Sequence, residues 1–161
     1  MEKRTGKDDY YLGIADAVLS RSTCLRRKYG SIIVKDDEII STGYNGAPRG
    51  RKNCIDLGHC TRENLNIPSG ERYELCRSVH AEQNAIISCS RRDMLGSTLY
   101  LMGRDAKTGE LLPSAESCSL CKRFIVNAGI ERVVTRSSEG GIEVTQVSQW
   151  VLNDDSLPKV R

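Results

Sequence analysis

The sequence has no long apolar run, few aromatic residues and little net charge, and each absence excludes a class of protein. No run approaches the roughly 18 apolar residues of a transmembrane helix, so we expect no membrane partner. Aromatic residues are only 5%, with one Phe and one Trp, which speaks against a groove that stacks nucleic-acid bases. Lys and Arg number 24 and Asp and Glu 21, and this net charge of +3 is too small to favour duplex DNA.

The sequence also lacks signs of export or of division into parts. The first residues, Met-Glu-Lys-Arg-Thr-Gly-Lys-Asp-Asp, are charged where a signal peptide has an apolar core. The 161 residues contain no internal repeat, low-complexity segment or linker, and a domain typically takes about 150 residues. Hydrophobic residues at 39% and charged residues at 28% suit a folded, soluble protein. We therefore expect one cytoplasmic domain over residues 1–161.

Cysteine, by contrast, is frequent. An odd number of cysteines without an export signal argues against a disulfide framework. In a reducing cytoplasm, so many thiols more often serve as metal ligands. The seven residues are Cys24, Cys54, Cys60, Cys76, Cys89, Cys118 and Cys121.

Hydrophobic periodicity predicts helices that alternate with short strands. Apolar residues at three- and four-residue steps, and a stop at Gly129, predict helices over 10–20, 81–90 and 118–128. Short β-branched runs predict strands over 31–35, 38–44, 98–102, 132–135 and 142–147. This order predicts an α/β protein in which helices cover one mixed or partly parallel sheet. Residues 46–77 have little hydrophobic periodicity. An irregular stretch of this length is expected either to be functional or to be held in place by cross-links.

Two short motifs together predict a metal centre. His80-Ala-Glu82 and Cys118-Ser-Leu-Cys121 each stand at the start of a predicted helix, where the helix dipole favours thiolates. One imidazole and two thiolates satisfy three positions of tetrahedral zinc, and water can take the fourth. The sequence therefore predicts a catalytic zinc held by His80, Cys118 and Cys121.

Glu82 is expected to be the general acid and base of this centre. It lies two residues from His80, so the two side chains cannot point the same way on a regular helix. Glu82 is thus a poor second ligand, yet near enough to reach a metal-bound water. The alternative is a closed structural zinc site with a fourth protein ligand and an incidental Glu82. Cys89 lies on the apolar face of its predicted helix and is expected to pack in the core.

With these motifs in place, the sequence resembles the cytidine/deoxycytidylate deaminase superfamily, and within it the dCMP deaminases. The resemblance covers about residues 9–147, and the stretch from Thr42 to Pro48 is its most dCMP-deaminase-like part. The segments that carry it are Cys24-Leu-Arg-Arg-Lys-Tyr-Gly30, Ser31-Ile-Ile-Val34, Ser41-Thr-Gly-Tyr-Asn-Gly-Ala-Pro48, His80-Ala-Glu-Gln-Asn-Ala-Ile86 and Cys118-Ser-Leu-Cys121.

The resemblance implies a fold, a reaction and an assembly. The fold would be a three-layer α/β/α cytidine-deaminase-like fold with a five-stranded mixed sheet. The reaction would be zinc-dependent hydrolysis of dCMP to dUMP and ammonia, the chemistry of the zinc nucleobase deaminases. The protein would form a homo-oligomer, with a hexamer favoured, and dCTP and dTTP would be its allosteric effectors.

The same resemblance implies substrate-binding residues. Asn45 would hydrogen-bond the sugar, although an Asn-Gly pair at 45 and 46 also suits a left-handed turn. Ala81 would lie against the substrate. Arg26 and Arg91 would bind the phosphate, although solvated surface charge explains both arginines equally well.

Two departures from the family pattern put the substrate, more than the chemistry, in question. Ser117 stands where the family usually has Pro, although Ser is a good helix cap. The loop over 104–116 is longer than usual and could form a flap over the pocket.

The remaining cysteines suggest a second, structural zinc. Some relatives carry one, and Cys24 and Cys54 fall at matching places, where Cys60 and Cys76 could complete an all-cysteine site. His59 is an alternative to Cys60, since adjacent residues rarely bind the same ion. Such a site would hold down the irregular stretch, whereas the alternative is that these are free thiols.

Other functions remain as alternatives. A deaminase of CMP or of a modified dCMP would share these motifs. A non-catalytic zinc-binding assembly subunit would have no use for Glu82. Deamination of bases in RNA or DNA expects more aromatic residues than this chain has.

Overall fold

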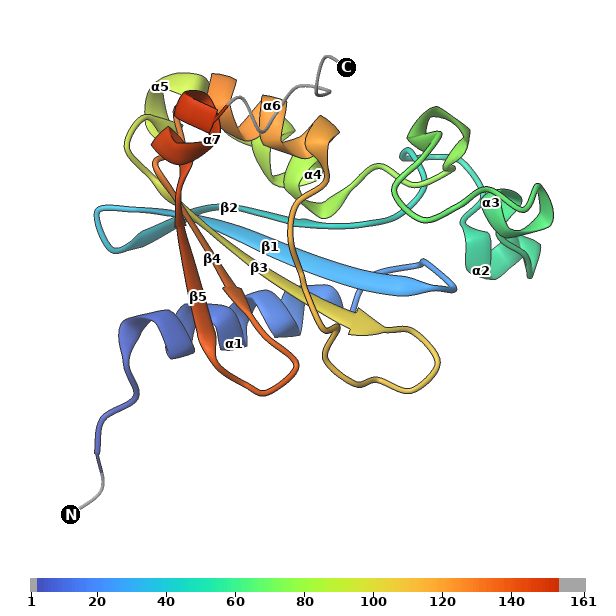
Figure 1. Cartoon of the computed structure of the whole chain (residues 1–161), viewed down its shortest axis with the longest axis horizontal. Coiled ribbons are helices and arrows are strands. Elements are labelled where there is room, and N and C mark those ends of the chain that lie inside the picture. Colours follow the sequence, from blue (N-terminus) through green and yellow to red (C-terminus); the bar gives the residue numbers. More distant parts are fainter. Residues whose placement is uncertain (1–2, 154–161) are drawn as a thin grey trace.

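A computed structural model describes residues 3–153 of the chain, which fold around a five-stranded sheet (Figure 1). The strand order is β2-β1-β3-β4-β5. Only β3 and β4 pair in parallel, and the other neighbours are antiparallel. The strands are β1 (Arg27–Lys35), β2 (Glu38–Tyr44), β3 (Thr98–Asp105), β4 (Arg132–Arg136) and β5 (Ile142–Gln146).

Helices cover both faces of this sheet. The helix α1 (Lys7–Leu19) lies on one face, and α4 (Ala81–Ile87), α5 (Arg91–Met94), α6 (Ser119–Ala128) and α7 (Val147–Asn153) lie on the other (Figure 1). The predicted three-layer α/β/α fold with a mixed sheet is therefore confirmed. Within residues 3–153, no helix combines the length and apolarity that a bilayer crossing requires.

The strands place alternate side chains in two separate cores, because successive side chains of a strand point to opposite faces. In β3, Leu99 and Leu101 pack in the core beneath α4 and α6, while Tyr100 and Met102 pack against α1. Ile33 and Ile32 of β1 divide in the same way, and both are fully buried. The central strands are thus buried on both faces and form a rigid base for the helices.

The start of α4 sits directly on the β1–β2 hairpin. A Cβ atom at Gly43 would lie 2.3 Å from the Ala81 carbonyl oxygen, so only glycine permits this approach. The Ser31 hydroxyl donates a hydrogen bond of 2.9 Å to the same oxygen. These contacts fix the first turn of α4, which follows His80 and contains Glu82.

The segment between β2 and α4 contains short helical turns and no strand. These turns are α2 (Cys54–Leu57), α3 (Thr61–Asn64) and the 3-10 turn η1 (Tyr73–Leu75). In Figure 1 they lie together at one end of the sheet. The expected irregular stretch is therefore partly helical, with turns too short for hydrophobic periodicity to reveal.

Several boundaries differ from those expected. The predicted helix over 81–90 is two helices, because α4 ends at Ile87 and the Ser90 hydroxyl caps α5 by accepting from the Asp93 amide. The strand β1 begins at Arg27 instead of residue 31. The helix α7 was not predicted, and its buried Trp150 packs in the core beneath α6.

Candidate metal centre and adjoining pocket

Three potential metal ligands converge where α4 and α6 begin. The His80 Nδ1 atom lies 3.5 Å from the Cys118 Sγ atom and 3.3 Å from the Cys121 Sγ atom. His80 caps α4 and Cys118 caps α6, where its sulfur accepts from the Cys121 amide. In the part of the chain that the structure describes, no other three His, Cys, Asp or Glu side chains bring their ligand atoms within 4.8 Å of one another.

This donor set fits zinc. Tetrahedral zinc has Zn–N distances of about 2.0–2.1 Å and Zn–S distances of about 2.3 Å, which places N and S roughly 3.5 Å apart. The observed separations of 3.3 and 3.5 Å match that requirement. His80 and Cys118 also line a pocket, so a fourth ligand can reach the ion from that side.

The thiol and imidazole groups of this centre have shifted pKa values. The hydrogen bond from Cys121 lowers the pKa of Cys118, which favours the thiolate form of this sulfur. Burial lowers the pKa of His80, but the sulfurs of Cys118 and Cys76 outweigh burial and raise it to about 10. Because thiolates and neutral imidazole are the binding forms, metal binding here displaces protons.

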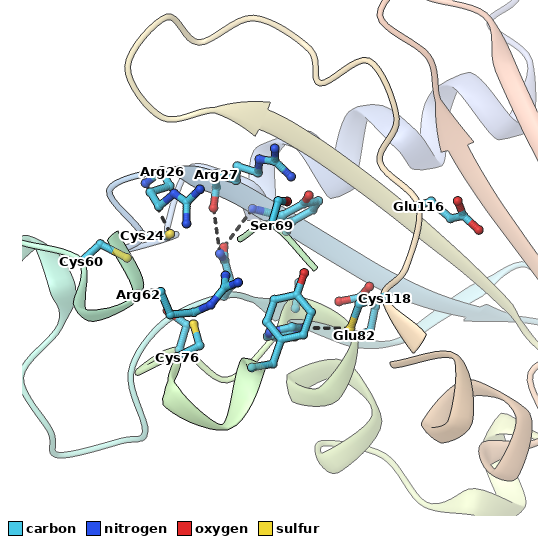
Figure 2. Close-up of a pocket in the computed structure, with 16 residues that line it drawn as sticks. Cys24, Arg26, Arg27, Cys60, Arg62, Ser69, Cys76, Glu82, Glu116 and Cys118 are labelled. Atoms are coloured by element: carbon cyan, nitrogen blue, oxygen red, sulfur yellow. Dashed lines mark hydrogen bonds between the residues drawn. The ribbon is translucent and has the colours of Figure 1, made fainter. Parts of the chain in front are cut away.

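Glu82 is buried in the wall of this pocket, with an exposed fraction of 5%. Burial raises the pKa of its carboxyl group above the usual 4.5, although His80 and the Ser117 hydroxyl oppose the shift. Figure 2 shows Glu82 beside Cys118. A carboxyl group with a raised pKa, next to a metal site, can both accept and return a proton.

The pocket extends from the metal centre toward the start of β1 and the segment between β2 and α4 (Figure 2). From the loop over 104–116, only Glu116 lines it, so the expected flap is not formed by most of that loop. Ala81 lines the pocket between His80 and Glu82. The lining also includes the side chains of Arg26, Arg27, Asn45, Arg62, Tyr73 and Cys76.

Asn45 lines the pocket, and most of its side chain is engaged in holding the pocket wall. Its Oδ1 atom accepts from the Tyr29 amide and the Ser22 hydroxyl, and its Nδ2 atom donates to the Arg27 carbonyl. Its φ is not positive, so the left-handed turn considered above is wrong. Among the bonds within residues 3–153, its second N–H has no acceptor and is available to a ligand.

The two arginines expected to bind phosphate lie in different places. Arg26 lines the pocket and pairs with Glu63 at 3.0 Å. Arg91 begins α5, donates to the Asn127 carbonyl at 2.8 Å and does not line the pocket. The break between α4 and α5 turns Arg91 toward the end of α6, so its placement does not fit the expected role.

Arg62 and Tyr73, which the sequence did not single out, also line the pocket. The Arg62 guanidinium lies over the Tyr73 ring at 4.7 Å, and that ring meets His80 edge-on at 5.0 Å. Both residues come from the stretch without periodicity, where only its irregular length signalled a functional segment. Their contacts depend on tertiary folding.

The four cysteines expected to bind a second zinc lie in one region without forming a ligand group. Cys24, Cys60 and Cys76 line the pocket, and burial and these three thiols together raise the pKa of Cys54. No three of the four place their sulfurs within 4.8 Å of one another. His59 is exposed and bonds the Leu57 carbonyl. Cys89 is half-buried and packs at the margin of the core.

Comparison with known proteins places these features in a family. Residues 5–137 match the family model of the cytidine and deoxycytidylate deaminase zinc-binding region. The deoxycytidylate deaminase of Mycobacterium phage D29 is 40% identical over 132 residues, covering 79% of this chain and 91% of the phage protein. The Schizosaccharomyces pombe deoxycytidylate deaminase is 32% identical over 135 residues, covering 84% of this chain and 38% of the yeast protein.

A solved structure supports the same relationship. The apo crystal structure of dCMP deaminase from cyanophage S-TIM5 superposes with a TM-score of 0.58 at 26% identity, covering 83% of this chain and 85% of that protein. The same phage enzyme in complex with dCMP and dUMP gives a TM-score of 0.55 at 25% identity, covering 84% of each chain.

Proposed function

The chain belongs to the cytidine and deoxycytidylate deaminase family, and we propose that it hydrolyses dCMP to dUMP and ammonia at a zinc centre. The observation that carries this proposal is the convergence of His80, Cys118 and Cys121 beside the buried carboxyl group of Glu82. A purely structural zinc site has no need of a buried acid with a raised pKa. This arrangement therefore favours catalysis over a zinc-binding assembly subunit.

We assign the three ligands to zinc and the proton transfers to Glu82. Zinc, when bound, supplies a Lewis acid that makes water acidic enough to attack near neutral pH. The Glu82 carboxylate takes a proton from the attacking water and delivers it to N3 as oxygen bonds to C4 of cytosine. Glu82 then carries the proton of the new C4 hydroxyl to the exocyclic amine, and ammonia leaves as the C4–N bond breaks and the C4 carbonyl forms.

The pocket walls suggest how the nucleotide lies. The free N–H of Asn45 would donate to the sugar, and Ala81 would leave room for the pyrimidine between His80 and Glu82. Arg26 would approach the phosphate, while Arg91 is given no substrate contact. Glu116, whose carboxylate pairs with Lys122 at 2.6 Å, borders the same opening.

A substrate panel with a matched variant tests this function. The wild-type protein should deaminate dCMP in preference to CMP, cytidine and dCTP. Glu82→Gln preserves size and should retain zinc while losing turnover by a factor of about 10² to 10⁴. A variant with wild-type turnover would refute the role of Glu82. A preference for CMP or a modified dCMP would leave the proposed deamination chemistry intact but would mean that dCMP is not the substrate.

We propose in addition a second, structural zinc bound by Cys24, Cys54, Cys60 and Cys76. Its support is that their thiols gather around one end of the pocket and that the segment carrying three of them has only short helical turns. Binding would require these sulfurs to move together. Metal analysis of the purified protein should then give about two zinc ions per chain, as catalytic and structural sites together require. A ratio near one zinc ion per chain would refute the second site.

Assembly, regulation and location are also proposed from the family resemblance. The expected state is a homo-oligomer, with a hexamer favoured, and the exposed side chain of Ile87 on α4, 74% accessible, is available for such contacts. dCTP and dTTP are the expected effectors. None of the seven cysteines forms a disulfide, which suits a reducing cytoplasm.

A further inference from the structure

One arginine in the pocket is buried and forms no ion pair among the residues that the structure describes. Arg62 is only 7% exposed. Within residues 3–153, no carboxylate lies close enough to form an ion pair with it, whereas Arg26 pairs with Glu63 and Arg72 with Glu74. An unpaired buried charge is costly, and such groups usually have an anionic partner.

The guanidinium of Arg62 is fixed in place but not fully used. Its Nη2 atom donates to the Pro68 carbonyl at 2.8 Å and the Glu71 carbonyl at 2.7 Å, and its plane rests over the Tyr73 ring. Its Nε atom is buried with no hydrogen-bond partner in the described part of the chain. A rigid cation with an unused donor is preorganised to receive an acceptor from a ligand.

The position of Arg62 relative to the metal centre suggests which part of a ligand it meets. The Tyr73 ring connects Arg62 to the metal centre, because the guanidinium lies over its face and the ring meets the His80 imidazole edge-on. Figure 2 shows Arg62 and Arg26 on the side of the pocket away from Glu82 and Cys118. A pyrimidine at the metal centre would therefore direct its 5′ substituent toward the arginines.

We propose that Arg62 binds the 5′-phosphate of the substrate and thereby makes this site select nucleoside monophosphates over nucleosides. The inference rests on the proposed function for the orientation of the pyrimidine. The phosphate dianion supplies the missing counter-charge and the acceptor for Nε. Arg26 is a weaker candidate for this role, because Glu63 already neutralises it.

Equilibrium binding of the reaction product tests this proposal without requiring turnover. Calorimetry should show that Arg62→Gln weakens dUMP binding by roughly 10- to 150-fold, as expected for a lost charge-assisted hydrogen bond. Binding of deoxyuridine, which lacks the phosphate, should change by less than about threefold. Arg91→Gln is the matched control, since Arg91 does not line the pocket, and should leave both affinities unchanged.

Two outcomes would overturn the proposal. Equal losses for dUMP and deoxyuridine would mean that Arg62 only shapes the pocket, and an unchanged dUMP affinity would mean that it does not meet the phosphate. If Arg62→Gln fails to fold, Arg62→Met, which also lacks the charge, is judged by the same two criteria. A wild-type protein that binds dUMP but does not deaminate dCMP would refute the proposed function and leave this test intact.

Discussion

Replacing Gly43 by alanine should damage the active site through the fold alone. The added Cβ atom would lie 2.3 Å from the Ala81 carbonyl oxygen and 2.4 Å from the Ala85 amide nitrogen. Both atoms belong to the backbone of α4, so no flexible side chain can move aside. The strand β2 and the helix must separate by about 1 Å to restore ordinary contact, which is typically made at 3.5–4.0 Å.

The expected cost has a part in stability and a part in catalysis. Forcing one methyl group into a packed interface typically costs about 1–3 kcal/mol. For a protein of this size, that lowers the melting temperature by roughly 2–12 °C. Because α4 carries Glu82 in its first turn and follows His80, a displacement near 1 Å should also reduce kcat for dCMP by about 10²-fold.

Gly13→Ala provides the matched control. Gly13 is an exposed residue within α1, and a Cβ atom there would meet nothing within 4 Å. Alanine in a helix is favoured over glycine by about 1 kcal/mol, so this variant should be slightly more stable and fully active. Thermal unfolding and dCMP turnover of both variants decide the matter. Wild-type stability and turnover in Gly43→Ala would refute the claim that this contact positions the site.

Two further predictions concern the metal and the response to acid. Cys118→Ser should reduce bound zinc by about one equivalent while keeping the helix cap, and Cys89→Ser should lose none, as metal analysis can check. The hydrogen bond from Arg132 holds the pKa of Asp8 below its usual 3.8. This pair therefore stabilises the fold above about pH 4 and loses that effect as pH falls through the lowered pKa. Arg132→Gln should reduce the free energy of unfolding at pH 7 and flatten its decline below about pH 4, and an unchanged pH profile would contradict this.

The metal centre could be predicted because its geometry is encoded locally. His80 and Glu82 flank the start of one helix, and Cys118 and Cys121 flank the start of another. In each motif, the helix start sets where the side chains point, so spacing in the sequence already fixes spacing in the structure. What the motifs could not give is the contact between the two helices, which depends on how both pack against the sheet.

The errors in the predicted elements also have identifiable physical causes. The strand β1 starts before the predicted residue 31 because Arg27 and Lys28 pair with the end of β3. This contact is non-local, and the polar character of the two residues gives no sign of it in the sequence. The helix over 81–90 divides because Ser90 offers a cap that competes with continuation. Arg91 follows that break and does not line the pocket, a placement that the family resemblance alone could not show.

The least predictable segment supplies the recognition surface, and this division follows from what each part must do. The metal ligands need fixed geometry. They lie at the starts of helices that pack on a sheet whose central strands are buried on both faces. Arg62 and Tyr73 come instead from short turns. These turns are held together by hydrogen bonds that the Arg62 Nη2 atom donates to the Pro68 and Glu71 carbonyls. Because these turns contribute little to either core, substitutions in them can change which nucleotide is bound without disturbing the zinc ligands.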